Sequence, residues 1–357
     1  MKQIHFLILL KFVTVAFSNE TISGSTIFSG LTRDPNHVQF FLVKDWKNQQ
    51  KIVVNDTNSL ANSGFRQGTK TFLLIDGYDS PRTPFYNLTI EAIRANRATT
   101  NDNVIIVDYR NLSGRETTFS ANSFTSAFLY LSVVRNTNIL GERVANFLHF
   151  LQRQGNLSLQ DVHVVGMSLG CHVAGATAHY LQEKNGHNVS QNLGRITGLD
   201  PARTFYPLRM VQRLRSSNGG ASFIDVYHTN RGILGEVYEG TVDLNVYVNG
   251  GIIQPGCGRE DLTLVPLPGI CSHLFAWEVF AASFHRDFFA CPCTGSDCDC
   301  SVNCRTCSPS SDNNTAVKIG LNVSKRTRGT YHLSVTDPAP GKYYKQYKQI
   351  FFENVQS

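Results

Sequence analysis

The sequence DVHVVGMSLGCHVAG, residues 161–175, combines a buried-strand pattern, a sharp turn and a helix start around one serine. An apolar run opens at Val162, and residues 166–170 then fit the pattern G-x-S-x-G around Ser168. This pattern is typical of a strained strand-to-helix turn that exposes a serine hydroxyl above a sheet, where a side chain at either glycine would crowd the turn. The bare pattern also arises by chance, so the strand before it and the small residues of 171–181 after it support the prediction of a nucleophilic serine.

Short apolar runs alternate with segments of helical spacing along the rest of the chain. Strands are predicted at Val38 to Val43, Thr71 to Ile75, Val104 to Val107, Val162 to Val165, Ile196 to Leu199 and Phe223 to Tyr227, and helices at Asn87 to Ala98, Gly141 to Gln154 and Cys171 to Leu181. This alternation predicts an α/β fold, with a mostly parallel central sheet covered by helices on both faces. In such sheets the reactive groups lie at the carboxyl ends of the strands.

An acid and a base can be assigned relative to that edge. Asp200 directly follows the predicted strand 196–199, in GLDPA, where a carboxylate can orient a histidine. An α/β-hydrolase has the order serine, acid, histidine. The candidates for the base are therefore His228, His273, His285 and His332. We favour His273, because Cys271 lies two residues earlier and a bridge to Cys257 would fix the loop that carries it. The alternative is that His273 is merely a loop histidine beside a structural disulfide, without a catalytic role.

With GMSLG, GLDPA and CSHL in this order, the chain resembles the pancreatic-lipase-like family of secreted α/β-hydrolases over about residues 72–285. The resemblance implies a single disulfide-stabilised α/β-hydrolase domain acting on lipid. It also implies that the catalytic triad is Ser168, Asp200 and His273. The oxyanion hole would be the backbone N–H groups of Tyr78 and Leu169.

In this family the disulfide loop before the histidine is the lid, which here would be residues 258–270, closed by Cys257 and Cys271. Its apolar residues are expected in the pocket wall: Leu262, Leu264, Val265 and Leu267. This lid and the neighbouring loop 230–242 are both short, as in the phospholipases A1 of insects and venoms. The resemblance therefore implies hydrolysis of the sn-1 acyl ester of glycerophospholipids. A neutral triacylglycerol or galactolipid lipase, or an inactive lipid-binding protein, are the alternatives.

Three departures or omissions shape the remaining expectations. Asp76 stands where the family usually has a histidine. Residues 210–222 contain no Asp or Glu, so the acidic calcium ligands of pancreatic lipases are missing and no metal or other cofactor is expected. The chain stops where larger lipases begin a C-terminal β-sandwich, so neither that domain nor a colipase partner is expected.

Nine cysteines suit a secreted, disulfide-bonded chain, and the odd count leaves at least one over. Cys171 is the expected free thiol, among the small residues behind Ser168. Six of the others crowd into 291–307, where three local disulfides are favoured over a metal cluster.

Residues 1–18 have a basic start, an apolar run and a small-residue end, which predict a signal peptide and a secreted mature chain over 19–357. Eight N-glycosylation sequons agree with that route: Asn19, Asn55, Asn87, Asn111, Asn156, Asn188, Asn313 and Asn322. The net charge of +6 comes without a dense basic cluster, so no nucleic-acid partner is expected. We expect a monomer acting at a membrane or micelle surface. The tail 342–352 is interpreted as a final strand, with a membrane-interface segment as the alternative.

Overall fold

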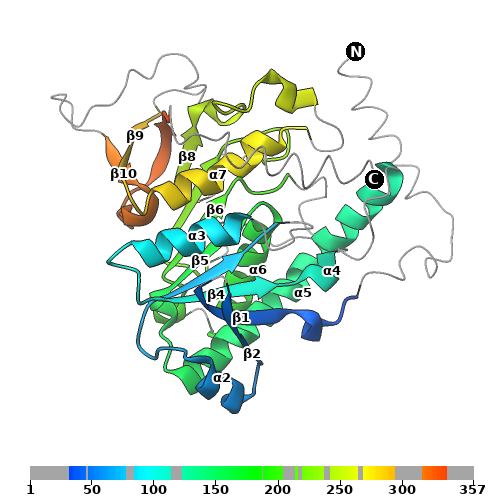
Figure 1. The fold of residues 1–357 in the computed structure, drawn as a ribbon, viewed down its shortest axis with the longest axis vertical. Helices are drawn as coiled ribbons and strands as arrows, with labels where there is room; N and C mark the ends of the chain where they lie inside the picture. The colour runs from blue at the N-terminus through cyan, green and yellow to red at the C-terminus, as the bar shows by residue number, and fades with distance from the viewer. Residues whose placement is uncertain are drawn as a thin grey trace.

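The computed structural model describes residues 32–45, 47–77, 84–113, 123–186, 188–203, 214–215, 219–236, 242–263, 268–293 and 316–335. Within this part of the chain, 11 strands form one sheet in the order β10-β9-β11-β8-β7-β6-β5-β3-β4-β1-β2 (Figure 1). Seven neighbouring strands in its middle are parallel: β4 (Asn103–Asp108), β3 (Thr71–Ile75), β5 (Val162–Met167), β6 (Arg195–Leu199), β7 (Ile224–His228), β8 (Leu244–Val248) and β11 (Gly329–Leu333).

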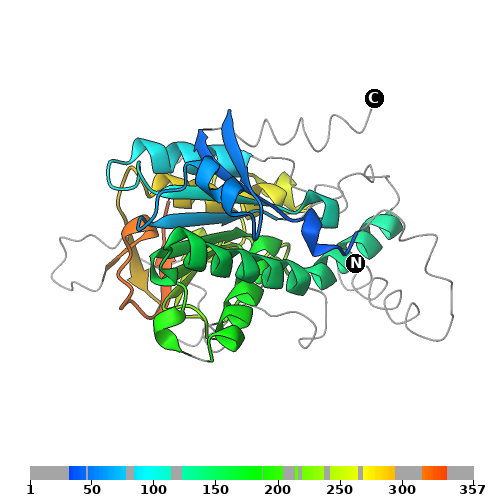
Figure 2. The same ribbon diagram turned by 90° about the horizontal axis from the view of Figure 1, so that it is seen from below.

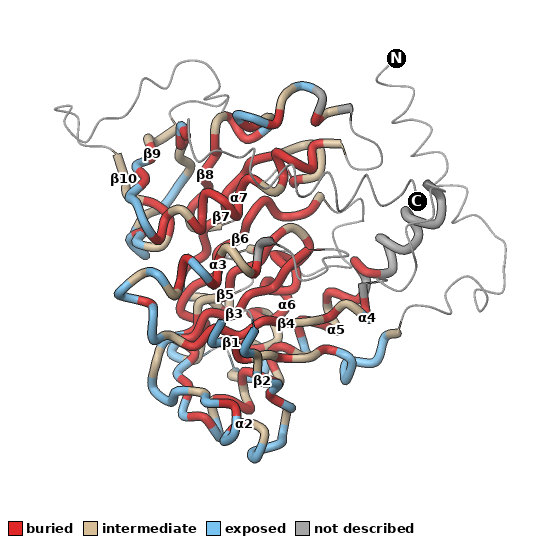
Figure 3. Tube along the Cα trace, in the orientation of Figure 1, coloured by how far each residue is buried: buried red, intermediate tan, exposed pale blue. Residues whose placement is uncertain are grey.

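Antiparallel strands complete both edges of the sheet: β1 (Gln39–Asp45) and β2 (Asn48–Ile52) beside β4, and β9 (Phe288–Pro292) and β10 (Val317–Ile319) beside β11. Every residue of β3, β6, β7 and β8 is buried, as expected for parallel strands covered on both faces. Figure 3 shows this buried centre, with exposed residues toward the edges of the molecule, among them those around β2 and the helix α2 (Thr57–Ser63).

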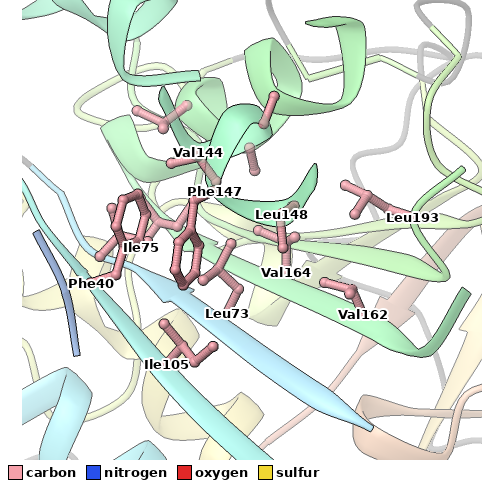
Figure 4. Packing of buried hydrophobic residues seen from close by; sticks show 14 of the residues in the cluster. Phe40, Leu73, Ile75, Ile105, Val144, Phe147, Leu148, Val162, Val164 and Leu193 are labelled. Carbon is pink, nitrogen blue, oxygen red and sulfur yellow. The ribbon is translucent and has the colours of Figure 1, made fainter. Parts of the chain in front are cut away.

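Helices cover the two faces of the sheet (Figure 2). The helices α5 (Ser123–Gly155) and α6 (Leu169–Lys184) share one hydrophobic cluster with one set of strand side chains, and α3 (Pro84–Ala95) and α7 (Ile270–Ala282) share another with the opposite set. In the first cluster the rings of Phe40 and Phe147 stack with their centroids 3.8 Å apart (Figure 4). The shorter helices are α4 (Arg110–Ser113) and the 3₁₀ turns Pro35–His37, Leu159–Asp161, Val189–Gln191, Asn249–Gly251, Arg259–Thr263 and Gly320–Asn322.

The predicted α/β fold with a mostly parallel sheet is confirmed. The first residue of each of the six predicted strands is within one position of the first residue of an observed strand. The helix predicted at Gly141 to Gln154 is the second half of α5, which begins at Ser123. The strands β2, β8, β9, β10 and β11 and the helix α7 were not predicted. No helix in the described ranges is both long and apolar enough to cross a bilayer.

Several of the sequence-based predictions fall on residues that the structure does not describe. These are the signal peptide 1–18, the sequons Asn19 and Asn313, Tyr78, the lid residues 264–267, most of the cysteine-rich segment 291–307 and the tail 342–352.

Candidate active site

Ser168 lies on the turn between β5 and α6, in a backbone conformation with φ 54° and ψ −117°. Such a conformation costs on the order of 1–3 kcal/mol for a residue with a side chain. Two glycines make it possible. A Cβ atom on Gly166 would lie 2.6 Å from the carbonyl oxygen of Gly170, and one on Gly170 would lie 2.2 Å from that of Ile75. The G-x-S-x-G pattern is therefore a steric requirement of this strand-to-helix crossing.

The end of β3 lies beside Ser168. A Cβ atom on Gly77 would be 3.0 Å from the Ser168 Cβ and 3.5 Å from its Oγ. Asp76, which replaces the usual histidine, accepts the Gly77 N–H on its own carboxylate at 2.7 Å. The Tyr109 hydroxyl donates to the carbonyl oxygens of Asp76 and Gly77, at 2.5 and 2.8 Å. The backbone before Tyr78 is thus held against the serine, while Tyr78 itself lies outside the described residues.

Leu169, the other predicted oxyanion donor, is the first residue of α6. The first N–H groups of a helix have no acceptor inside it, and the aligned peptide dipoles make this end favourable for negative charge. The position of Leu169 therefore suits an N–H that stabilises an oxyanion at Ser168.

Asp200 follows β6, the strand next to β5, and its side chain is fully buried. Its Oδ1 accepts the backbone N–H groups of Thr229 and Asn230, at 2.8 and 3.0 Å, just beyond the end of β7. A Cβ atom on Gly235 would lie 2.6 Å from the Asp200 Oδ2. The carboxylate is therefore held by two hydrogen bonds to Oδ1, and Gly235 packs closely against both of its oxygens.

His273 approaches that second oxygen, with its Nδ1 2.5 Å from the Asp200 Oδ2. An imidazole bonded to a carboxylate through Nδ1 presents Nε2 as the nitrogen available for proton transfer. His273 lies in the first turn of α7 and not on the loop that the sequence analysis expected. The reason is that nearly every residue of α7 is buried, so the sequence lacks the apolar stripe of an amphipathic helix.

The other three candidate bases point elsewhere. The Nε2 of His228 lies 2.9 Å from the Asn245 Oδ1, and that of His332 lies 3.0 Å from the Ser334 Oγ. Burial lowers the pKa of His228 and His332. His285 is exposed beyond the end of α7. Among the four histidines, His273 is the one that contacts Asp200.

The start of α7 is tied to the preceding loop by the predicted disulfide between Cys257 and Cys271, whose Cα atoms are 5.6 Å apart. A second tie is Asp261, which is fully buried and accepts the N–H groups of Cys271 and Ser272, each at 3.0 Å. The role of Asp261 was not predicted from the sequence. An acidic residue shortly before a helix can indicate a carboxylate that caps the helix N-terminus. This signal could not be used here, because the start of α7 was not predicted.

The predicted pocket wall is described at one of its four positions. Leu262 is half-buried, in the 3₁₀ turn Arg259–Thr263, and Leu264, Val265 and Leu267 lie outside the described residues. In the described part of the chain, one group of possible metal ligands comes together, made of Cys257, Asp261 and Cys271. Both sulfur atoms of that group are used by the disulfide, so it does not fit a thiolate-bound metal ion.

Cys171 is a free, buried thiol, as predicted, and its Sγ donates to the carbonyl oxygen of Gly166 at 3.1 Å. Burial raises the pKa of this thiol well above its usual range, and the carboxylate of Asp200 raises it further. Cys171 therefore packs the turn behind Ser168 as a neutral group. Cys291 is disulfide-bonded, and the rest of its segment beyond residue 293 is not described.

Comparisons with known proteins identify the family of this chain. The family model named Lipase matches residues 17–340. The chain belongs to the lipase family. It is 30% identical over 291 residues to a putative endothelial lipase of Crotalus adamanteus, covering 77% of this chain and 52% of that protein. It is also 30% identical to the pancreatic triacylglycerol lipase of Myocastor coypus, covering 73% and 55%, and 28% identical to the lipoprotein lipase of Bos taurus, covering 86% and 63%.

The chain thus spans about half to two thirds of the length of these lipase relatives. Among solved structures, it is similar to an esterase/lipase from an uncultured bacterium, at 14% identity and a TM-score of 0.24, covering 54% of this chain and 57% of that one. A carboxylesterase described as putative, from Lactobacillus plantarum, has 11% identity and a TM-score of 0.28, covering 61% and 73%. The resemblance to the pancreatic-lipase-like family is confirmed by the family match and by these relatives.

Proposed function

We propose that this lipase-family chain is a secreted carboxylic ester hydrolase in which Ser168 is the nucleophile, His273 the general base and Asp200 the acid of the triad. One observation carries the proposal. The 2.5 Å contact between Asp200 and His273 lies at the same edge of the sheet as the strained turn of Ser168. The nucleophile follows β5, the acid follows β6 and the base lies in the first turn of α7, which is the chain order of an α/β-hydrolase.

In the proposed reaction, His273 takes the proton of the Ser168 hydroxyl as the oxygen attacks the ester carbonyl. The N–H groups of Leu169 and Tyr78 stabilise the resulting oxyanion, and Asp200 stabilises the imidazolium. His273 then protonates the leaving alcohol, and an acyl-enzyme remains. Water, deprotonated by His273, attacks the acyl carbon. His273 then returns this proton to the Ser168 oxygen as the fatty acid leaves, which restores the serine hydroxyl.

For the substrate, we propose a phospholipase A1 that cleaves the sn-1 acyl ester of glycerophospholipids at a membrane or micelle surface. Two short loops support this proposal. The disulfide ring before His273 joins cysteines only 14 positions apart, and the segment that follows β7 turns back on itself within Asn230 to Gly235. Short loops leave room at the entrance for a bulky polar head group.

The deciding assay uses phosphatidylcholine with different acyl chains at sn-1 and sn-2, incubated with the secreted protein in the presence of a chelator. We expect release of the sn-1 acid and of a lysophospholipid. Ser168→Ala should reduce turnover by a factor on the order of 10⁶ and leave the protein folded. Unchanged turnover in that variant would refute the assigned mechanism.

The second candidate is a triacylglycerol lipase, which is favoured by the name of one relative, the pancreatic triacylglycerol lipase of Myocastor coypus. Assaying triacylglycerol in parallel separates the two. Hydrolysis confined to the neutral lipid would replace the phospholipase assignment and keep the triad. Inactivity on both lipids would point to a lipid-binding protein.

A further inference from the structure

The N-terminus of α7 is capped by a residue outside the helix. Its N-cap position is Gly269, which has no side chain to cap with. The Asp261 carboxylate takes that place, with one oxygen accepting the N–H of Cys271 and the other that of Ser272. The carbonyl oxygen of Asp261 also accepts the Gly269 N–H, at 2.7 Å. Three hydrogen bonds therefore join the 3₁₀ turn Arg259–Thr263 to the first turn of the helix.

The hydrogen bonds to the Asp261 carboxylate are stronger than they would be in contact with water. Asp261 is fully buried, so water does not compete for its oxygens. A carboxylate at a helix N-terminus is also stabilised by the aligned peptide dipoles. Without it, two buried N–H groups would lose their acceptors.

The next residue in this turn is His273. Its backbone N–H makes the first hydrogen bond of the helix, to the Gly269 carbonyl at 2.8 Å. The direction of its imidazole toward Asp200 is therefore set by where α7 begins. The disulfide holds the same turn through the rotatable side chain of Cys271, whereas Asp261 holds the backbone itself.

We propose that Asp261 is a positioning residue for the active site, an inference that rests on the function proposed above. By fixing the backbone of Cys271 and Ser272, Asp261 holds the His273 imidazole at hydrogen-bonding distance from Asp200. It also fastens the base of the 258–270 loop to the helix that carries His273. A displacement of about 1 Å in such a group can cost as much as 10²-fold in rate.

The test is Asp261→Asn, compared with Asp56→Asn, with both variants and the wild type produced in a host that does not N-glycosylate, because Asp261→Asn creates the sequon pattern N-x-T over residues 261–263. Asp56 is a control for the loss of a capping carboxylate, because as the N-cap residue of α2 it accepts the N–H groups of Asn58 and Ser59 on its Oδ1, each at 3.0 Å. We expect kcat of Asp261→Asn on phosphatidylcholine to fall about tenfold with an unchanged KM. Asp56→Asn should keep the wild-type kcat, because α2 carries none of the proposed triad.

Titration of Ser168 with a fluorophosphonate measures the concentration of folded, reactive enzyme. Each kcat is then calculated per molecule of folded enzyme. If Asp261→Asn yields no folded protein, Asp261→Ser, with a single hydroxyl acceptor, is measured in its place against the same outcomes. A wild-type kcat overturns the inference, and so does an increase in KM at constant kcat, which would indicate a role in substrate binding. If Ser168→Ala remains active, the proposed function itself fails; an inactive Ser168→Ala with a fully active Asp261→Asn removes only the role of Asp261.

Discussion

At the scale of single residues, the carboxylate of Asp200 shows how closely the site is packed. Its Oδ1 accepts two backbone N–H groups, and its Oδ2 lies 2.5 Å from the Nδ1 of His273. Gly235 packs against both oxygens, which lie 2.6 and 2.7 Å from where its Cβ would be. The surrounding atoms leave no space for a methyl group between this loop and the acid.

We therefore expect Gly235→Ala to displace the Asp200 carboxylate and to lower kcat by about tenfold or more, with little change in KM. The control is Gly155→Ala at the end of α5, where the new Cβ would lie 3.1 Å from the Phe65 ring, away from the triad. Steady-state kinetics of the two variants decide the matter. Equal kcat values in both would show that the Gly235 contact does not position the acid.

The sequence points to the three residues of the proposed triad because each stands in a local pattern that can be found without a structure. Ser168 and Asp200 follow apolar runs, and His273 follows a cysteine. The partners of Asp200 were not predictable in this way. Thr229 and Asn230 reach it from 29 and 30 positions away, through the register of two neighbouring strands. Asp261 was missed for the same reason, since its role depends on the place where α7 begins.

At the scale of elements, the contact between α5 and α6 explains a glycine in the middle of a long helix. A Cβ atom on Gly141 would lie 2.3 Å from the Cβ of Ala176 and 2.8 Å from its carbonyl carbon. The two helices therefore approach closely at this point, and α6 is the helix that directly follows Ser168.

Two effects of opposite sign decide the outcome of Gly141→Ala. Alanine favours the helix by about 1 kcal/mol over glycine. Overpacking costs about 1–3 kcal/mol in general, and here the contact includes backbone atoms that cannot rotate away. We expect the crowding to dominate, so that the free energy of unfolding in urea falls. The neighbouring Glu142→Ala is the control, and a stabilised Gly141→Ala would show that the helices separate at little cost.

The elements differ in how well the sequence predicts them. The strand β5 and the helix α6 were predicted because an apolar run, a turn and a small-residue helix follow one another. The strand β8 was missed because Asn245 interrupts its apolar residues, although its side chain is buried beside His228. The helix α7 was missed because it is buried nearly all round and shows no helical stripe.

At the scale of the whole molecule, residues distant in sequence are joined by buried polar contacts. The Arg195 guanidinium binds both carboxylate oxygens of Asp225, at 2.9 and 2.7 Å, and donates to the carbonyl oxygens of Gly320 and Leu321. The Tyr227 hydroxyl accepts the Gly320 N–H at 2.7 Å. These bonds attach the segment next to β10 to the centre of the sheet, an attachment that no local sequence pattern reveals.

Global stability should also depend on one buried acid, Glu278 of α7, because burial raises the pKa of its carboxyl from 4.5 to about 8. In the unfolded chain the same group ionises near its ordinary pKa of 4.5. From about pH 5 to pH 8 the folded protein keeps this proton while the unfolded chain has released it. Each pH unit in that window therefore lowers the free energy of unfolding by about 1.4 kcal/mol, and the loss levels off above the folded pKa.

The glutamine of Glu278→Gln cannot ionise. We therefore expect the free energy of unfolding of this variant, relative to that of the wild type, to increase steadily from about pH 5 to pH 8. Urea titrations at several pH values in this range measure the difference, with Glu91→Gln, at an exposed site on α3, as the control. The control curve should run parallel to that of the wild type. If the Glu278→Gln curve is parallel as well, the carboxyl of Glu278 ionises equally in the folded and unfolded chain, and burial on α7 does not hold its proton.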